Sequence, residues 1–376
     1  MKAVLLANMP WQHDGETNRQ AWARALLATV PNIDVTYVET IGWQPLPRRP
    51  RIVLQNASGT VTVQRAWNLL PWAARPANRR RRTVNIRLTC ALLRAWARLR
   101  YRTAHIDLVT IFDPLAADAV GRLSAERVIY DCLDFYSEQP QFCDPKQRAA
   151  LAVAEARLAH EVDSLWASSR PIAEYLETLG RAAHFAPGAL MRPKWSPIAL
   201  GDRAVHPPGT ARGIYVGALD PYKVDIDVFW RLLRCDPGVQ LVIIGGFQHS
   251  DREAYASYAE LAAHPRVRCP GPVPREELGP WLSDADFGIV AMTRGTYSNG
   301  SFPLKYWDYQ WAGLPILAVH CPALAHQPGV VACETTHAID SRALASTLEK
   351  GRGASLYVQH AARHDAEARV RRIVGE

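Results

Sequence analysis

Short apolar segments alternate with helical patterns almost from one end of the chain to the other. In the first half the strand-like segments read AVLLA, DVTYVE, DLVTIF, RVIYDC and DSLWAS; in the second half they read RGIYVG, VQLVIIGG, RVRCPG, DFGIVAM and PILAV. Continuous Val/Ile/Leu strands with helices between them are typical of parallel sheets that are covered on both faces. The pattern therefore predicts an α/β protein with two Rossmann-like, doubly wound parallel-sheet domains.

The helices between these strands are expected near residues 18–29, 86–101, 145–160 and 171–179, and then near 224–233, 251–263, 275–284 and 303–312. A length of 376 residues suits two domains. We expect a first domain at 1–186, a Pro- and Gly-rich linker at 187–210, a second domain at 211–350, and a C-terminal helix at 351–376 that crosses back to the first domain. Ligands of such sheets bind at the carboxyl ends of the strands, so the site is expected in the cleft between the domains.

Composition narrows the class of protein. Hydrophobic residues make up 48% of the chain and charged residues 21%, as in globular proteins. No apolar run reaches the ~20 residues of a membrane span, and the first residues read better as a buried strand than as a signal peptide. Seven scattered cysteines without a C-x-x-C pair predict reduced thiols, a cytoplasmic protein and no structural zinc.

The net charge of +8 is unevenly distributed. Residues 1–105 carry 17 basic and 4 acidic side chains, whereas the remainder carries 27 and 32. The excess is concentrated in PRRPR (47–51) and NRRRR (78–82). Such runs form solvated loops in many proteins; docking to an anionic membrane surface and capture of an anionic acceptor are the alternatives. Nucleic acid is not expected, since no binding motif surrounds the arginines. The aromatic segment 67–76 fits either an interfacial or a packing role.

One segment of the second half, SFPLKYWDYQWAGLPILAV (301–319), combines charge with a buried setting. Lys305 and Asp308 fall at i and i+3 on one face of the expected helix. Amides at the start of a helix together with a lysine can bind a diphosphate, and an acidic residue one turn later can accept ribose hydroxyl protons. The alternative is a surface Lys–Asp pair, but the segment is too apolar for an exposed helix.

This segment resembles the nucleotide-sugar segment of GT-B glycosyltransferases, PLK-x-x-E-Y-x-A-x-G-x-P-V-V-A in family-4-type enzymes. YVGALDPYKVD, LVIIGG and GPVPREELGPWLSDADFGIVAM precede it in the same order. The resemblance implies that Lys305 contacts the diphosphate, Asp308 the ribose, and the Val273 backbone the base. It also implies a donor pocket that includes Gly217, Ala218, Tyr297, Asn299, Ser301 and Phe302.

The first half resembles bacterial cell-surface polysaccharide glycosyltransferases, including a teichuronic-acid-type group and the xanthan glucuronosyltransferase, through RVIYDCLDFYSEQP and VDSLWASSRPIAEYLETLG. An aspartate at the position of Asp134 is the catalytic base in the last of these, so Asp134 is the expected general base and Asp131 the reserve. The opening NMPWQHDGETNRQAWARAL fits the acceptor-side loop of this fold more loosely. His13 is an alternative base there, and Trp11, Asp14 and Arg19 are candidate acceptor contacts.

Two departures bear on the mechanism. Retaining family-4 enzymes carry a Glu-x7-Glu pair, but here the first position is Gly300 and the second is Asp308. The usual PNGVD is PGALM at 187–191, which again lacks an acid. We therefore favour inversion at the anomeric centre. No D-x-D motif stands in a pocket-like context, since DAD at 284–286 reads as a helix end and a strand start; no metal or other cofactor is expected.

The sequence thus predicts a glycosyltransferase that moves a sugar from a nucleotide diphosphate sugar, UDP being favoured by the resemblance. The expected acceptor is a hydroxyl of a polysaccharide precursor, a lipid-linked saccharide or a natural product. The protein is expected in the cytoplasm, and on the inner face of the cell membrane as a peripheral protein if the acceptor is lipid-linked. A non-catalytic nucleotide-sugar-binding protein and another GT-B enzyme, such as a nucleotide-sugar epimerase, are the alternatives. A Rossmann oxidoreductase fits poorly, because no G-x-G-x-x-G follows a strand.

Overall fold

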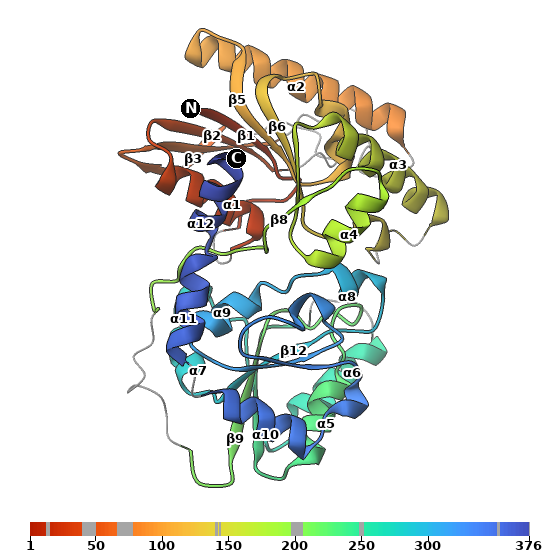
Figure 1. Cartoon of the computed structure of the whole chain (residues 1–376), viewed down its shortest axis with the longest axis vertical. Helices are drawn as coiled ribbons and strands as arrows, with labels where there is room; N and C mark the ends of the chain where they lie inside the picture. Colours follow the sequence, from red (N-terminus) through yellow and green to blue (C-terminus); the bar gives the residue numbers. More distant parts are fainter. Residues whose placement is uncertain are drawn as a thin grey trace. The chain divides into compact units, whose positions relative to one another are not determined.

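The structure is a computed structural model of the chain, and it describes residues 1–12, 16–39, 50–65, 78–139, 142, 144–196, 206–247, 252–351 and 354–375. The chain divides into two compact units (Figure 1). The first comprises Met1–Met191 and Arg369–Glu376, and the second comprises Arg192–Ala368. The change of unit at 191/192 falls within the segment 187–210 that was predicted as the linker.

The first unit contains an eight-stranded sheet with the order β3-β4-β2-β1-β5-β6-β7-β8. Its strands, in chain order, are β1 (Lys2–Leu6), β2 (Ile33–Val38), β3 (Arg51–Asn56), β4 (Gly59–Gln64), β5 (His105–Ile111), β6 (Ser124–Cys132), β7 (Ser164–Ala167) and β8 (His184–Phe185). Every neighbouring pair is parallel except β3 and β4, which form an antiparallel hairpin at the sheet edge. Sequence analysis missed this hairpin, although β3 contains the apolar residues 52–54 and the interior strand β4 buries Val61 and Val63.

Helices of the first unit are α1 (Asn18–Thr29), α2 (Arg79–Tyr101), α3 (Pro145–Glu161) and α4 (Arg170–Thr178), with short 3₁₀ turns η1 (Pro114–Ala119) and η2 (Tyr136–Glu138). Helix α12 (Ala366–Gly375) belongs to this unit from Arg369 onward. A capping box of Thr17 and Gln20 fixes the start of α1. The loop predicted for NRRRR is wrong: Arg79–Arg82 form the first turn of α2. Arg82 is buried with Asn85 and Ile86, so packing of this face holds the turn in the helix. Segments 40–49 and 66–77, which hold most of PRRPR and the aromatic run, lie outside the described residues.

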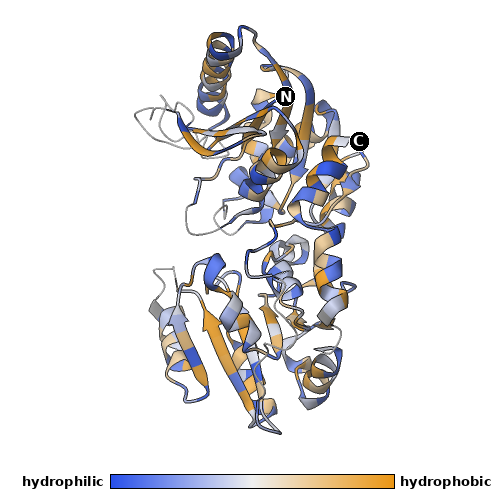
Figure 2. Ribbon diagram, turned by 90° about the vertical axis from the view of Figure 1, so that its left-hand side faces the viewer, coloured by the Kyte–Doolittle hydropathy of each residue, from blue (hydrophilic) through white to orange (hydrophobic). Residues whose placement is uncertain are grey.

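The second unit contains a six-stranded, wholly parallel sheet with the order β11-β10-β9-β12-β13-β14. Its strands are β9 (Ala211–Val216), β10 (Val239–Ile244), β11 (Val267–Gly271), β12 (Phe287–Ala291), β13 (Ile316–Val319) and β14 (Val330–Cys333). Helices α5 (Asp227–Cys235), α6 (Arg252–Ala262), α7 (Gly279–Ser283), α8 (Thr296–Gly300), α9 (Lys305–Trp311), α10 (Ser341–Lys350) and α11 (Ala354–Arg363) surround it. The strands are strongly hydrophobic (Figure 2), as expected for a sheet buried on both faces.

Helix α9 is fixed to this sheet by Tyr309. Its hydroxyl donates to the carbonyls of Ile214 and Ile289 and accepts from the amide of Val216, each at 3.1 Å. The ring lies against Gly288, where an added Cβ would come within 2.4 Å of it. The buried phenol therefore satisfies its polar group on the strands themselves, and this anchor sets where the side chains of α9 lie. The predicted fold class, two doubly wound parallel-sheet domains, is confirmed.

Candidate functional site in the second unit

Lys305 begins α9 in an unusual setting for an ammonium group. Its Nζ lies 3.6 Å from the centroid of the Tyr215 ring, a contact that stabilises a cation without neutralising it. The pKa of Lys305 is lowered to about 7, chiefly by desolvation on burial and in part by the neighbouring Lys223, while Cys321 and Asp220 act in the opposite sense. No carboxylate of the described chain forms an ion pair with Lys305. Its charge is therefore available to an incoming anion.

Glycine lines the strand ends beside this lysine. Gly217 follows β9 with φ of +137°, and a Cβ there would lie 3.2 Å from the Lys305 Nζ. Gly245 follows β10 with φ of +141°, and a Cβ there would overlap the carbonyl of Gly217. Both positions thus require glycine for conformation and for space. They leave backbone uncovered at the carboxyl edge of the sheet, where ligands of this architecture bind.

Lys223 is a site residue that sequence analysis missed. It lies in the loop after β9, with its Nζ 5.1 Å from the Tyr222 ring centroid and 5.9 Å from that of Tyr297. The positive charge of Lys223 lowers the pKa of Lys305, so two lysines lie close together at one strand edge and mark a place where an anion binds. A signal was present in YVGALDPYKVD, which carries a lysine six residues after the glycine, but nothing in the sequence indicated that this lysine comes near Lys305.

Asp308 lies one turn after Lys305 and is almost fully buried. Its Oδ1 accepts from the Arg275 Nε at 2.9 Å. Burial raises the pKa of Asp308, and the Arg275 guanidinium opposes this rise. Arg275 comes directly after the GPVP turn that contains Val273, the residue expected to contact the nucleotide base. The ion pair therefore connects this turn to Asp308, the residue expected to contact the ribose. Sequence analysis did not single out Arg275.

The remaining donor-side candidates fall into two groups. Ser301 and Phe302 are buried: the Ser301 amide and hydroxyl both donate to the Tyr297 carbonyl, and the Phe302 ring stacks on Trp307. These two Ser301 donors are engaged, so the amide expected to help bind a diphosphate closes α8 instead. Tyr297 and Val273 are half-buried, and Asn299 is exposed. The Ala218 carbonyl accepts from the Tyr215 hydroxyl at 2.9 Å.

Candidate residues of the first unit

Asp131 and Asp134, three residues apart in sequence, have different environments. Asp131 is fully buried near the end of β6, and both its oxygens accept from Arg369 of α12, at 2.6 and 2.7 Å. Its Oδ2 also accepts from the Trp22 indole at 3.1 Å. The residue was expected as the reserve base, and it forms a buried ion pair across 238 residues of sequence. Asp134 lies just beyond the strand end and is half-buried.

The acceptor-side candidates are partly internal. Arg19 is buried at the start of α1, where it donates to the Ala7 carbonyl and to the Tyr136 hydroxyl. Trp11 is buried too, with its ring edge-on to Tyr37 at 5.1 Å. Packing accounts for both residues as the structure stands. His13 and Asp14 lie outside the described residues.

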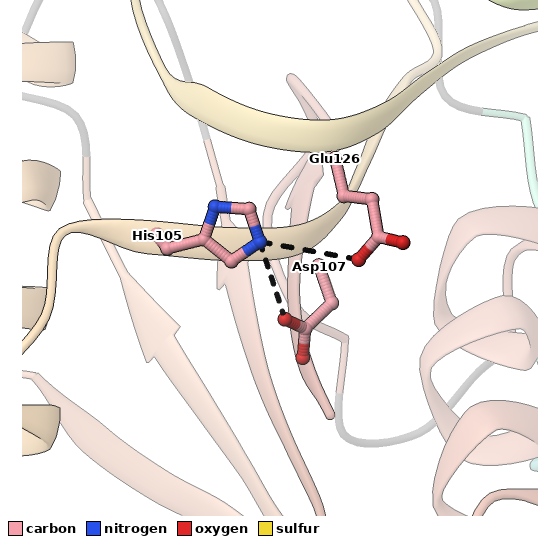
Figure 3. A group of neighbouring side chains, drawn as sticks. All are labelled: His105, Asp107 and Glu126. Carbon is pink, nitrogen blue, oxygen red and sulfur yellow. Dashed lines mark ion pairs between the residues drawn. The ribbon is translucent and has the colours of Figure 1, made fainter.

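Within the described residues, one group of side chains has metal-ligating chemistry: His105, Asp107 and Glu126 (Figure 3). The His105 Nε2 lies 3.8 Å from Asp107 and 3.9 Å from Glu126. These residues stand at or near the amino ends of β5 and β6, whereas Asp134 follows the carboxyl end of β6. The group therefore lies at the end of the strands opposite the candidate base.

Among the described helices, none has the length and hydrophobicity that a membrane span requires.

With this geometry established, comparison with known proteins identifies the class. Residues 211–350 match the family described as glycosyl transferases group 1. The match falls within the second unit, which holds Lys305, Lys223 and the glycine-lined strand ends.

Individual relatives agree with this class. The chain is 24% identical over 211 residues to TuaH of Bacillus subtilis (strain 168), a protein assigned to teichuronic acid biosynthesis as a glycosyltransferase; the match covers 53% of this chain and 52% of TuaH. The chain thus spans about half the length of this curated relative.

Solved structures match over the whole chain. Sucrose-phosphate synthase from Thermosynechococcus elongatus is 16% identical to this chain with a TM-score of 0.73. The match covers 100% of this chain and 97% of the synthase chain. Anabaena Alr3699/HepE, in complex with UDP and glucose, is 12% identical with a TM-score of 0.65, covering 100% and 98%. At these identities the likeness shows the fold, which is that of GT-B glycosyltransferases; the predicted GT-B resemblance is confirmed.

Proposed function

We propose that the protein is a glycosyltransferase that binds a nucleotide diphosphate sugar, with UDP as the nucleotide, at the carboxyl edge of the second sheet. The observation that carries this proposal is the Lys305–Lys223 pair beside Gly217 in a group 1 glycosyltransferase domain. Two ammonium groups stabilise the charge that develops on a leaving diphosphate, and the low-dielectric setting of Lys305 strengthens that interaction. The UDP complex of HepE supports UDP as the nucleotide.

Asp308 and Arg275 contribute by positioning. In this proposal the Asp308 carboxylate accepts from the ribose hydroxyls while Arg275 holds it in place from the GPVP turn. A buried carboxylate with a single ion-pair partner retains lone pairs for two hydroxyl donors. Asp308 thus orients the nucleoside, and Lys305 one turn away faces the phosphates.

For the transfer step we propose Asp134 as the general base. The acceptor oxygen attacks the anomeric carbon, the bond from that carbon to the phosphate oxygen breaks, and the nucleoside diphosphate leaves with the electron pair. The acceptor proton passes to the Asp134 carboxylate. Attack opposite the leaving group inverts the anomeric centre. Asp131 has no part in this step, because it is fully buried in its ion pair with Arg369 and cannot be reached by an acceptor.

We further propose a saccharide on a polysaccharide-precursor lipid at the cytoplasmic membrane face as the acceptor. The likeness to TuaH and the basic first unit support this choice. A soluble natural-product acceptor is the competing candidate, and a non-catalytic nucleotide-sugar-binding protein would keep the lysine pair without needing Asp134.

Two experiments test the proposal in order. Calorimetric titration of UDP, GDP, ADP and dTDP should show binding of one diphosphate, UDP, and this binding should be at least about tenfold weaker in Lys305→Met. No binding by any of them to the folded protein would refute the donor site.

The second experiment compares Asp134→Asn with Glu138→Gln, a nearby half-exposed acid on η2, as control. If Asp134 is the base, donor affinity survives and transfer falls at least ~100-fold in Asp134→Asn alone. Unchanged turnover would remove Asp134 from the role.

A further inference from the structure

Helix α2 carries an unusual distribution of charge on the surface of the first unit. From Arg79 to Arg102 there are nine arginines and no acidic residue. Three arginines, Arg79–Arg81, lie exposed in the first turn, where the positive end of the helix dipole makes cations unfavourable. These three arginines therefore do not stabilise the helix. An anionic partner outside the helix would stabilise them.

The exposed face of α2 combines these arginines with apolar side chains. Arg80, Arg87, Arg94 and Arg98 follow one another at spacings of seven, seven and four, which places them along one side of the helix. No described carboxylate forms an ion pair with any of the four. Beside them run Val84, Leu88, Ala91, Ala95 and Leu99, of which Val84 is 48% and Leu99 86% exposed. Hydrophilic and hydrophobic residues alternate along this helix (Figure 2), which is the helix drawn in orange in Figure 1.

A separate groove lies beside the start of α2. It has a volume of about 250 Å³ between α2, η1 and α3, and Arg79, Arg82 and Arg157 line it together with alanines and a proline. Asp118, paired with Arg157 at 2.8 Å, is the one acid in its lining, so the cations outnumber it by three to one. At the rim stands Val153, which is 64% exposed. Basic walls over an apolar floor suit a phosphate that is joined to a hydrocarbon chain.

We propose that this surface, the exposed face of α2 and the adjoining groove, docks the protein on an anionic phospholipid bilayer. The arginines bind lipid phosphates, Val84 and Leu99 enter the interfacial layer, and the groove receives one lipid phosphate with the beginning of its chain. The biological purpose of the docking rests on the proposed lipid-linked acceptor. The docking itself needs no sugar. Vesicle binding can therefore be refuted while the donor site is confirmed, and the donor site can be refuted while vesicle binding is confirmed.

Flotation with vesicles tests the proposal on the full chain. Wild type should bind vesicles of phosphatidylglycerol and phosphatidylcholine in equal parts and not vesicles of phosphatidylcholine alone, and added salt should weaken the binding. Arg80→Gln/Arg87→Gln/Arg98→Gln should bind about a hundredfold more weakly, because each arginine near the surface contributes roughly fivefold. Glutamine is a good helix former, so α2 is retained.

A control variant has the same change in net charge. Arg234→Gln/Arg294→Gln/Arg342→Gln removes three exposed arginines of the second unit and should bind as wild type does. Equal loss in both triple variants, or no binding of wild type, would overturn the assignment of this face.

A second variant separates a membrane from a nucleic acid. Val84→Ser/Leu99→Ser keeps every charge and should weaken vesicle binding about tenfold or more through lost apolar burial. Binding of a short single-stranded RNA at least as tight as vesicle binding, lost in the arginine variant and unchanged in the serine variant, would assign the surface to nucleic acid instead and overturn the membrane proposal.

Discussion

Lys305 offers the sharpest test, because its depressed pKa links nucleotide binding to protons. In the free protein the pKa of Lys305 is about 7, so at pH 8 about one lysine in ten is charged. A bound diphosphate favours the charged form. At pH 8 the complex should therefore take up about 0.9 proton per UDP from solution.

The same linkage sets the pH dependence of affinity. If the bound lysine stays charged, the Kd of UDP should rise about fifteenfold between pH 7 and pH 8.5, since the free enzyme must first be protonated. The UDP phosphate itself, with a second pKa near 6, is already ionised over this range. Titration calorimetry in HEPES and in Tris at each pH measures both affinity and proton uptake. A Kd that is constant across this range would refute the reasoning.

Replacing the lysine tests the charge directly. Lys305→Met keeps the aliphatic chain and should weaken UDP binding by about 10–150-fold at pH 7, the range for a hydrogen bond to a charged group. It should also stabilise the free protein, by up to about 4 kcal/mol at or below pH 7, because burial of the lysine disfavours the folded charged state. This gain should shrink as the pH rises toward 10. Lys350→Met, at an exposed position of the same unit, is the matched control, and a destabilised Lys305→Met would contradict the assigned environment.

Three further perturbations follow. Gly217→Ala adds a Cβ 3.2 Å from the Lys305 Nζ at a φ of +137°, so UDP affinity should fall about tenfold and the melting temperature by a few degrees; unchanged affinity in calorimetry would place the ligand elsewhere. Arg369→Ala leaves the Asp131 carboxylate buried without its partner and should cost about 3–5 kcal/mol in urea unfolding of the first unit; a loss below about 1 kcal/mol would show that water replaces the partner. Burial raises the pKa of Glu155, so its contribution to stability is greatest below the unfolded pKa and is lost as the pH rises through the folded one. Glu155→Gln should flatten the decline in unfolding free energy as the pH rises above the ordinary glutamate pKa of 4.5, and parallel profiles would exclude this carboxyl as its source.

Much of the architecture was predictable from the sequence, because it depends on patterns that are local. Continuous apolar strands and the helices between them indicate parallel sheets, and a helix such as α1 begins with its own capping residues. The PLK-x-x-D segment likewise places Lys305 and Asp308 one turn apart on any helix. The arginine-rich first turn of α2 was missed, since a charged turn has no apolar period to mark it; the hairpin β3–β4 was missed too, although β4 buries Val61 and Val63.

Tertiary structure alone decided the environment of each charged group. Asp131 and Asp134 are alike in sequence, yet one is closed off by an arginine from the far end of the chain and the other is half-exposed at a strand end. Lys223 comes near Lys305 only because the end of β9 and the start of α9 meet at one sheet edge. Desolvation and ion pairing depend on which groups lie within a few ångströms, and for residues far apart in sequence that distance is set by packing rather than by any local pattern.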